Sequence, residues 1–198
     1  MIPRQFLITV TILFGLTIAM GVYVWQLRRR EISSPRPLAK EEHVAPPVSG
    51  AVERVTLYVA HDDVGELKAE SISIPLASGR QQRAADILQA LVNLYTAKGS
   101  THPLSPDAEV RQVFLVDSET AVIDLNSAFI EGQISGVLPE ELTVTSLVQS
   151  LATNVPGVTR VKILVDGKER ETLAGHADLT GFYDVQQVAG VVKQLSPQ

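Results

Sequence analysis

The sequence has no cysteine, few aromatic residues and no surplus of basic residues. Without cysteine there is no disulfide, thiol nucleophile or cysteine-ligated metal, and we expect no lipid-modified N-terminal cysteine. Lys and Arg number 17 against 22 Asp and Glu, giving a net charge of −5, so nucleic acid is not expected as a partner. A length of 198 residues with 45% hydrophobic residues is typical of one globular domain with additional segments.

The recognisable catalytic motifs are also missing. The sequence has no G-x-S-x-G elbow, no S-x-x-K, no G-x-G-x-x-G and no P-loop, and no two histidines have the i, i+4 spacing of a zinc helix. We therefore predict no catalytic residue, no metal and no cofactor. The alternative is an envelope hydrolase or metal-dependent enzyme, whose candidate residues are His61, Asp62, His176 and Asp178.

The N-terminus carries the longest apolar run. Residues 6–27 contain no charged side chain, and this run is long enough for the roughly 20 residues of a membrane-spanning helix. We predict an uncleaved membrane anchor in residues 1–30. A signal peptide cleaved near Ala19 and Gly21 is the alternative. Arg28, Arg29 and Arg30 follow the run, and the positive-inside rule would place the body in the cytoplasm.

Composition and periodicity divide the rest of the chain into three parts. Residues 31–51 are a Pro-rich linker, 52–185 form the domain and 186–198 a C-terminal tail. Within the domain, strand-like and helical periods alternate. Strands are expected at 52–60, 69–76, 110–117, 120–126 and 158–167, with a short last strand after Gly167, and helices at 80–98 and 139–155. This order predicts an α+β fold, a two-layer sandwich with two helices on one face of a largely antiparallel sheet.

The segment "LVDGKERETLAGHADL" near the C-terminus concentrates charged residues around two glycines. Asp166 and Gly167 form a strong hairpin-turn signal, because both accept a positive φ. Gly175 and His176 are expected in a second turn, with His176 and Asp178 holding the following loop by local hydrogen bonds. We interpret these residues as structural rather than catalytic.

Charged side chains on two elements could form a contact between copies of the chain. Arg160 and Lys162 alternate with the inward residues of one strand, so we expect them in solvent. Glu140 and Glu141 begin the second helix, where the helix dipole favours acidic side chains. A head-to-tail contact between these pairs is one prediction. A merely solvated face is the other.

Two stretches together resemble a known family. "AVIDLNSAF" and the later "PGVTRVKILVDGKERETLAGHADL" are similar to the GerMN domain of sporulation and spore germination proteins, over roughly residues 55–184. The resemblance implies an envelope-associated module with no known chemistry, similar in fold to the ring-building modules of sporulation and secretion machines. This sequence departs from many members in having a single copy of the domain and a membrane span in place of a lipidated cysteine. Its expected partners are further copies or other envelope proteins, with a cell-wall polymer as the alternative.

The resemblance also bears on location. Members of the family typically lie outside the cytoplasmic membrane, which implies a single-pass membrane protein with an extracytoplasmic C-terminal domain. That placement conflicts with the one that Arg28–Arg30 favour. We expect the placement of the family, because an N-terminal anchor with a translocated domain can tolerate flanking positive charge.

Overall fold

The computed structural model describes residues 50–197. Within this range no helix combines the length and the apolar character that crossing a membrane requires. The predicted anchor and most of the predicted linker lie outside the described residues.

The described chain begins with a long β-hairpin. Strands β1 (Val52–His61) and β2 (Glu66–Pro75) pair antiparallel along their whole length. Alternate residues of β1, Val55, Leu57 and Val59, are buried as their period-2 spacing predicts.

Helix α4 (Val137–Asn154) covers the second edge of β1, so the hairpin forms a sheet of its own. The Asn154 side chain accepts a hydrogen bond from the Thr56 N–H at 3.1 Å and donates one to the Thr56 carbonyl at 2.6 Å. The Ser150 hydroxyl accepts from the Tyr58 N–H at 2.8 Å. These side chains satisfy the strand edge that a third strand would otherwise pair with.

A second sheet has four strands in the order β3-β4-β5-β6. Its members are β3 (Val110–Leu115), β4 (Thr120–Leu125), β5 (Arg160–Val165) and β6 (Tyr183–Asp184). β3 and β4 form an antiparallel hairpin, whereas β4 and β5 are parallel. They are parallel because α3 (Ser127–Glu131) and α4 carry the chain back to the edge where β4 began.

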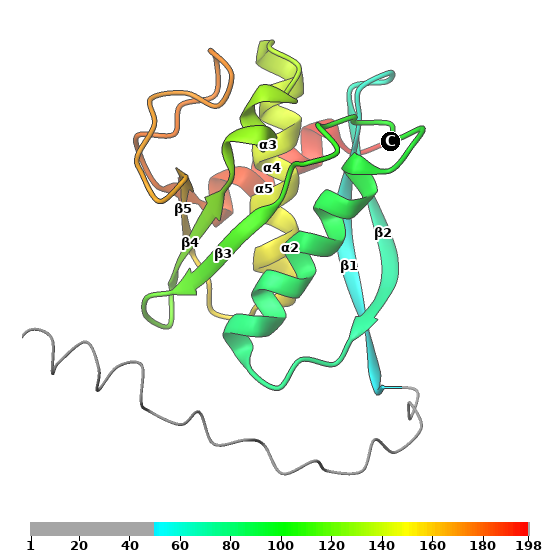
Figure 1. Ribbon diagram of the computed structural model, residues 1–198, viewed down its shortest axis with the longest axis vertical. Helices are drawn as coiled ribbons and strands as arrows, with labels where there is room; N and C mark the ends of the chain where they lie inside the picture. The colour runs from blue at the N-terminus through cyan, green and yellow to red at the C-terminus, as the bar shows by residue number, and fades with distance from the viewer. Residues whose placement is uncertain (1–49, 198) are drawn as a thin grey trace, which may run out of the picture. The chain divides into compact units, whose positions relative to one another are not determined.

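Three longer helices complete the core. Figure 1 shows α2 (Arg80–Thr96) and α4 between the four-stranded sheet on the left and the β1–β2 hairpin on the right. The predicted apolar stripe of α4 is buried, including Leu147, Val148 and Leu151. Helix α5 (Val185–Leu195) packs on α4 and contributes Val188 and Val192 to the core.

The predicted α+β class is confirmed, but the predicted architecture is wrong in two respects. The strands form an antiparallel hairpin and a mixed sheet instead of one largely antiparallel sheet, and the described residues contain four helices instead of two. The last of these, α5, occupies most of the predicted tail. Its signal is the capping residue Asp184 before apolar residues at helical spacing, Val185, Val188 and Val192. The predicted domain boundaries stay a prediction.

Candidate functional site

Glu140, in the first turn of α4, is the most highly hydrogen-bonded acid of the described chain and is fully buried. Its Oε2 accepts the backbone N–H groups of Ala174, His176 and Ala177 at 3.0, 2.9 and 2.8 Å. Its Oε1 accepts the Gly136 N–H at 3.1 Å and lies 2.9 Å from His176 Nδ1. The carboxylate therefore holds the 174–177 loop against the start of α4.

These donors also determine the protonation of Glu140. Burial alone would raise the pKa of the carboxyl, but the N–H groups of Ala174, Ala177 and His176, with the His176 ring, outweigh it and lower the pKa to about 2. The group is thus a carboxylate throughout the physiological range. A buried acid with this many donors is a structural anchor, because no lone pair is left for a substrate.

The second part of the "LVDGKERETLAGHADL" segment is built around this anchor. Leu173 and Leu179 are fully buried at either end, and Gly175 adopts a φ of 122° between them. Asp178 accepts two hydrogen bonds from Thr180, which are local as expected. His176 instead contacts a residue 36 positions earlier in the chain.

The first part of the segment is a tight turn, as the Asp-Gly pair predicts. Asp166 and Gly167 have φ of 50° and 72°, and the Val165 N–H donates to the Lys168 carbonyl. Asp124, from the end of β4, accepts the Gly167 N–H at 2.7 Å and fixes the turn to the sheet. The short strand predicted directly after Gly167 is wrong, because the next strand of the described chain is β6 at Tyr183–Asp184 and the chain between is a loop.

The candidate residues of the enzyme alternative each have another partner. Asp62 contacts His102 at 2.7 Å, and His61 lies 3.8 Å from Glu70. His176 and Asp178 are engaged with Glu140 and Thr180, as described above. Among residues 50–197, no three His, Asp or Glu side chains gather closely enough to hold a metal ion. Among the described residues, His61, Asp62, His176 and Asp178 therefore do not form one metal site, and the hydrolase alternative stays a hypothesis.

One buried hydrogen-bonded network, Asp62–His102–Thr143, has the same types of groups as the acid–histidine–hydroxyl triad of a hydrolase. His102 Nδ1 lies 2.7 Å from Asp62 Oδ1, and His102 Nε2 lies 2.8 Å from the Thr143 hydroxyl. Its ring packs edge-on against Tyr95. His102 is only 1% exposed and Thr143 is fully buried, so no substrate can reach the hydroxyl. These hydrogen bonds instead connect the loop before β3 to the β1–β2 hairpin and to α4.

The predicted contact surface is wrong for two of its four residues. Glu140 is buried, and so is Lys162, whose Nζ donates to the Thr180 carbonyl and pairs with Glu169 at 3.2 Å. The outer face of β5 is covered there by the 166–182 segment. Arg160 and Glu141 are exposed, and the Arg160 guanidinium lies 5.5 Å from the Phe182 ring centroid.

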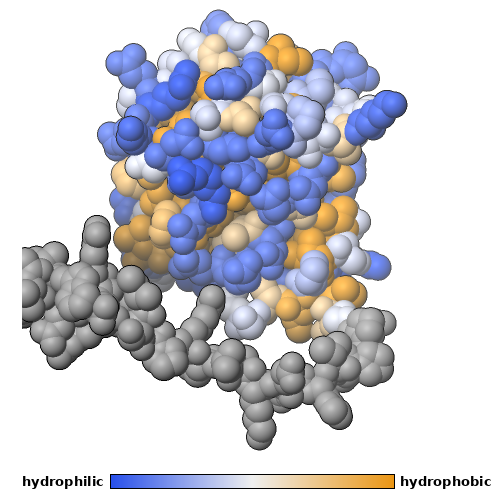
Figure 2. All heavy atoms as spheres, in the orientation of Figure 1, coloured by the Kyte–Doolittle hydropathy of each residue, from blue (hydrophilic) through white to orange (hydrophobic). Residues whose placement is uncertain are grey.

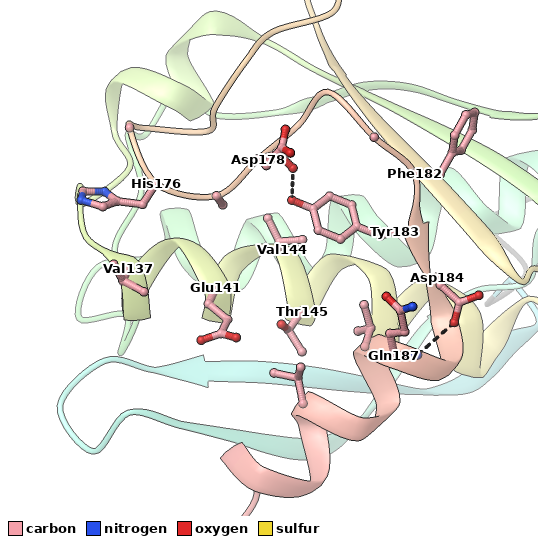
Figure 3. A pocket seen from close by; sticks show the side chains of 15 residues that line it. Val137, Glu141, Val144, Thr145, His176, Asp178, Phe182, Tyr183, Asp184 and Gln187 are labelled. Carbon is pink, nitrogen blue, oxygen red and sulfur yellow. Dashed lines mark hydrogen bonds between the residues drawn. The ribbon is translucent and has the colours of Figure 1, made fainter.

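An open groove of about 730 Å³ lies where this segment passes α4 and α5. Its volume falls within the range of roughly 300–1,000 Å³ typical of ligand sites. Val144 and Val188 form part of its floor, and Thr145 lies beside them. Figure 3 shows Tyr183 above α4, with its hydroxyl donating to the Asp178 carbonyl. Periodicity could not find this groove, because three separate elements form it.

The fold and the 174–177 loop held by Glu140 define a small α+β module. A protein-family model matches this part of the chain. The model described as sporulation and spore germination, named Germane, matches residues 56–171. The chain belongs to this family, which confirms the resemblance seen in the sequence. No curated protein matches the chain.

One solved structure shows the same fold at low sequence identity, and two others are similar to this chain. The tandem GerMN domains of the sporulation protein GerM from Bacillus subtilis are 20% identical with a TM-score of 0.54, covering 68% of this chain and 47% of that one. A lipoprotein from Clostridium perfringens is 22% identical with a TM-score of 0.47, covering 74% of this chain and 96% of that one. The first GerMN domain of GerM alone is 15% identical with a TM-score of 0.44, covering 65% and 94%.

Proposed function

We propose that this protein is a non-enzymatic assembly module of the cell envelope, which contacts a partner protein through the groove between α4, α5 and the 175–184 loop. The partner is another envelope protein or a second copy of the chain. Two observations support the proposal. The chain belongs to a family described as sporulation and spore germination, and the side chains of residues 50–197 have the arrangement set out below.

One observation carries the proposal. The buried ionisable groups Glu140 and His102 are committed to internal hydrogen bonds, while the groove is open to solvent and has apolar side chains in its lining. Its end residue Val137 is 68% exposed. Exposed apolar side chains beside a groove are typical of sites that another protein covers.

The location that we propose is outside the cytoplasmic membrane, with residues 1–30 as a single-pass anchor. The uncharged run of residues 6–27 supports the anchor, and the family supports the outward placement. A reporter enzyme that works only outside the cytoplasm, fused after Gln198, is expected to be active. An expressed but inactive fusion would favour the orientation that Arg28–Arg30 predict.

The groove itself is tested by site-specific photo-crosslinking of the full-length protein in its membrane. A photoreactive residue at Val137 is expected to give a discrete protein adduct. The matched control is Val52, which is 67% exposed but does not line the groove. An adduct of twice the chain's mass identifies self-association, which the planar confinement of an anchor would favour. Equal adducts from both positions, or none from Val137, would contradict the proposal, and adducts with sugar strands alone would favour the cell-wall polymer.

A further inference from the structure

The ionisable side chains that line the groove carry charge of almost one sign. Glu141 from α4, Asp178 from the loop and Asp184 at the start of α5 are carboxylates, and His176 is the remaining ionisable group besides Tyr183. No Lys or Arg of the described range lines the groove itself. Arg160 and Lys162 lie beside Phe182 at its end, 5.5 and 5.9 Å from the ring centroid, and Lys162 is already paired with Glu169. A partner that fills the groove must therefore neutralise negative charge, since an unpaired carboxylate covered by an apolar surface is costly.

These carboxylates retain capacity for a partner. Glu141 is exposed on α4. Asp178 uses one oxygen, Oδ1, for both hydrogen bonds from Thr180, and Asp184 uses Oδ1 to cap α5 through the Gln187 N–H at 3.0 Å. The Thr180 hydroxyl and N–H lower the pKa of Asp178, so this group is ionised at neutral pH. Each carboxylate can thus still accept from an incoming cation.

Apolar surface flanks these charges at both ends of the groove. Figure 3 places Val137 at one end and Phe182 at the other, with Glu141, Thr145 and Tyr183 between them. Phe182 is 55% exposed. Beyond Val137 the apolar surface continues through its neighbour Leu138, which packs beside Gly65 at the tip of the β1–β2 hairpin.

The part of the groove that runs along α4 fits a short peptide. Val137 and Thr145 are eight positions apart on α4, which corresponds to about 12 Å at roughly 1.5 Å per residue. An extended peptide covers that distance with about four residues, at roughly 3.3 Å each. Apolar side chains at the two ends and a cation between them would match the pattern of the groove.

A second exposed apolar surface lacks such a pattern. Figure 2 shows apolar spheres gathered toward the lower left of this face, where Figure 1 places the β3–β4 turn. Phe114 and Val116 are exposed near that turn. Both cations and carboxylates lie along β3 and its neighbours, and Arg111 is paired with Asp124 and Asp166. This surface therefore has no excess of one charge that would select a partner of the opposite charge.

We propose that the groove binds a peptide segment of a partner protein in which a Lys or Arg side chain lies between bulky apolar side chains. The cation lies among Glu141, Asp178 and Asp184, and the apolar side chains contact Val137 and Phe182. This inference rests on the proposed function, since it names the chemistry of the partner that the same groove takes.

The test measures binding of two fluorescein-labelled pentapeptides to the full-length protein in lipid nanodiscs, with empty nanodiscs subtracted. The probes are Leu-Val-Lys-Phe-Leu and its counterpart with Glu in place of Lys. The Lys peptide is expected to bind, more weakly at high salt because salt screens the charges, and the Glu peptide is expected not to bind. Equal binding of both peptides, or none of the Lys peptide, would overturn the inference.

Variants locate the charge. Glu141→Gln is expected to weaken binding of the Lys peptide about two- to five-fold, the range for one partly exposed ion pair. Asp184→Asn should do the same, while Asn keeps the cap of α5. Glu131→Gln is the matched control, since Glu131 is exposed outside the groove and should leave binding unchanged. Circular dichroism verifies that each variant is folded, and a folded Glu141→Gln that binds like Glu131→Gln would also overturn the inference.

The two proposals fail separately. A discrete adduct from Val137 in membranes, without binding of the Lys peptide, would leave the assembly function standing and reject the cationic segment. Binding of the Lys peptide that Glu141→Gln weakens, without any adduct from Val137, would support a cation-binding groove and count against assembly in the membrane.

Discussion

Replacing Glu140 by Gln changes the anchor of the 174–177 loop with almost no change in shape. The carboxylate accepts four backbone N–H groups and faces His176 Nδ1. In Gln one oxygen becomes an NH₂ group. Whichever way the amide is turned, this donor faces at least one backbone N–H of the protein, and the negative charge that the donors stabilise is gone.

The pKa of Glu140 gives the size of the expected effect. The folded protein lowers this pKa from the ordinary 4.5 to about 2. Since one pKa unit corresponds to about 1.4 kcal/mol, the ionised form contributes about 3 kcal/mol to the free energy of unfolding. Glu140→Gln should lose about that amount at neutral pH. At about 2–4 °C per kcal/mol for a body of this size, the midpoint of thermal unfolding should fall by about 6–12 °C.

The same anchor predicts a dependence on pH. Because the folded-state pKa lies below the unfolded one, the stabilisation is complete above about pH 5 and is lost as the pH falls toward 2. Urea unfolding of residues 51–198, followed by circular dichroism at a series of pH values, measures it. The difference between wild type and Glu140→Gln should therefore shrink on acidification.

A matched control separates the anchor from the charge of the helix terminus. Glu141→Gln removes the same charge from the neighbouring, exposed position, where we expect a change below about 0.5 kcal/mol. If Glu140→Gln were as stable as Glu141→Gln at neutral pH, or if its deficit stayed constant down to pH 2, the reasoning about the buried carboxylate would be refuted.

Three further predictions concern the body of the protein. Removal of residues 1–50 should leave a soluble, folded fragment, and an unfolded circular dichroism spectrum would contradict the predicted boundary. His102→Ala should cost about 2–4 kcal/mol in urea unfolding, because it leaves a cavity and removes the hydrogen-bonding partner of Asp62 and Thr143; a loss below about 1 kcal/mol would contradict this role. Gly167→Ala should cost about 1 kcal/mol, since its φ of 72° is unfavourable for a residue with a Cβ although no atom lies within 4 Å of the added Cβ; an unchanged midpoint would show that the turn relaxes.

Local patterns predicted the elements of this fold well. The period-2 spacing of Val55, Leu57 and Val59 and the helical spacing of Leu147 and Leu151 required only near neighbours in the chain, and the structure has a strand and a helix there. The family was also readable, because its motifs are short and contiguous. Lys162 shows where such reasoning fails. Its position in the alternating pattern of β5 predicted a solvent-exposed side chain, but a loop covers the outer face of the sheet and buries it.

The sequence by itself determined the α+β class, the Asp166-Gly167 turn and the membership of the family, because each depends on residue types within a few positions of one another. The tertiary structure alone decided how the strands divide into two sheets, what Glu140 does and where the groove lies. Asn154 closes the edge of β1 from 98 positions away, and Glu140 holds a loop 34 to 37 positions further along the chain. Such contacts depend on how whole elements pack, which no local period encodes.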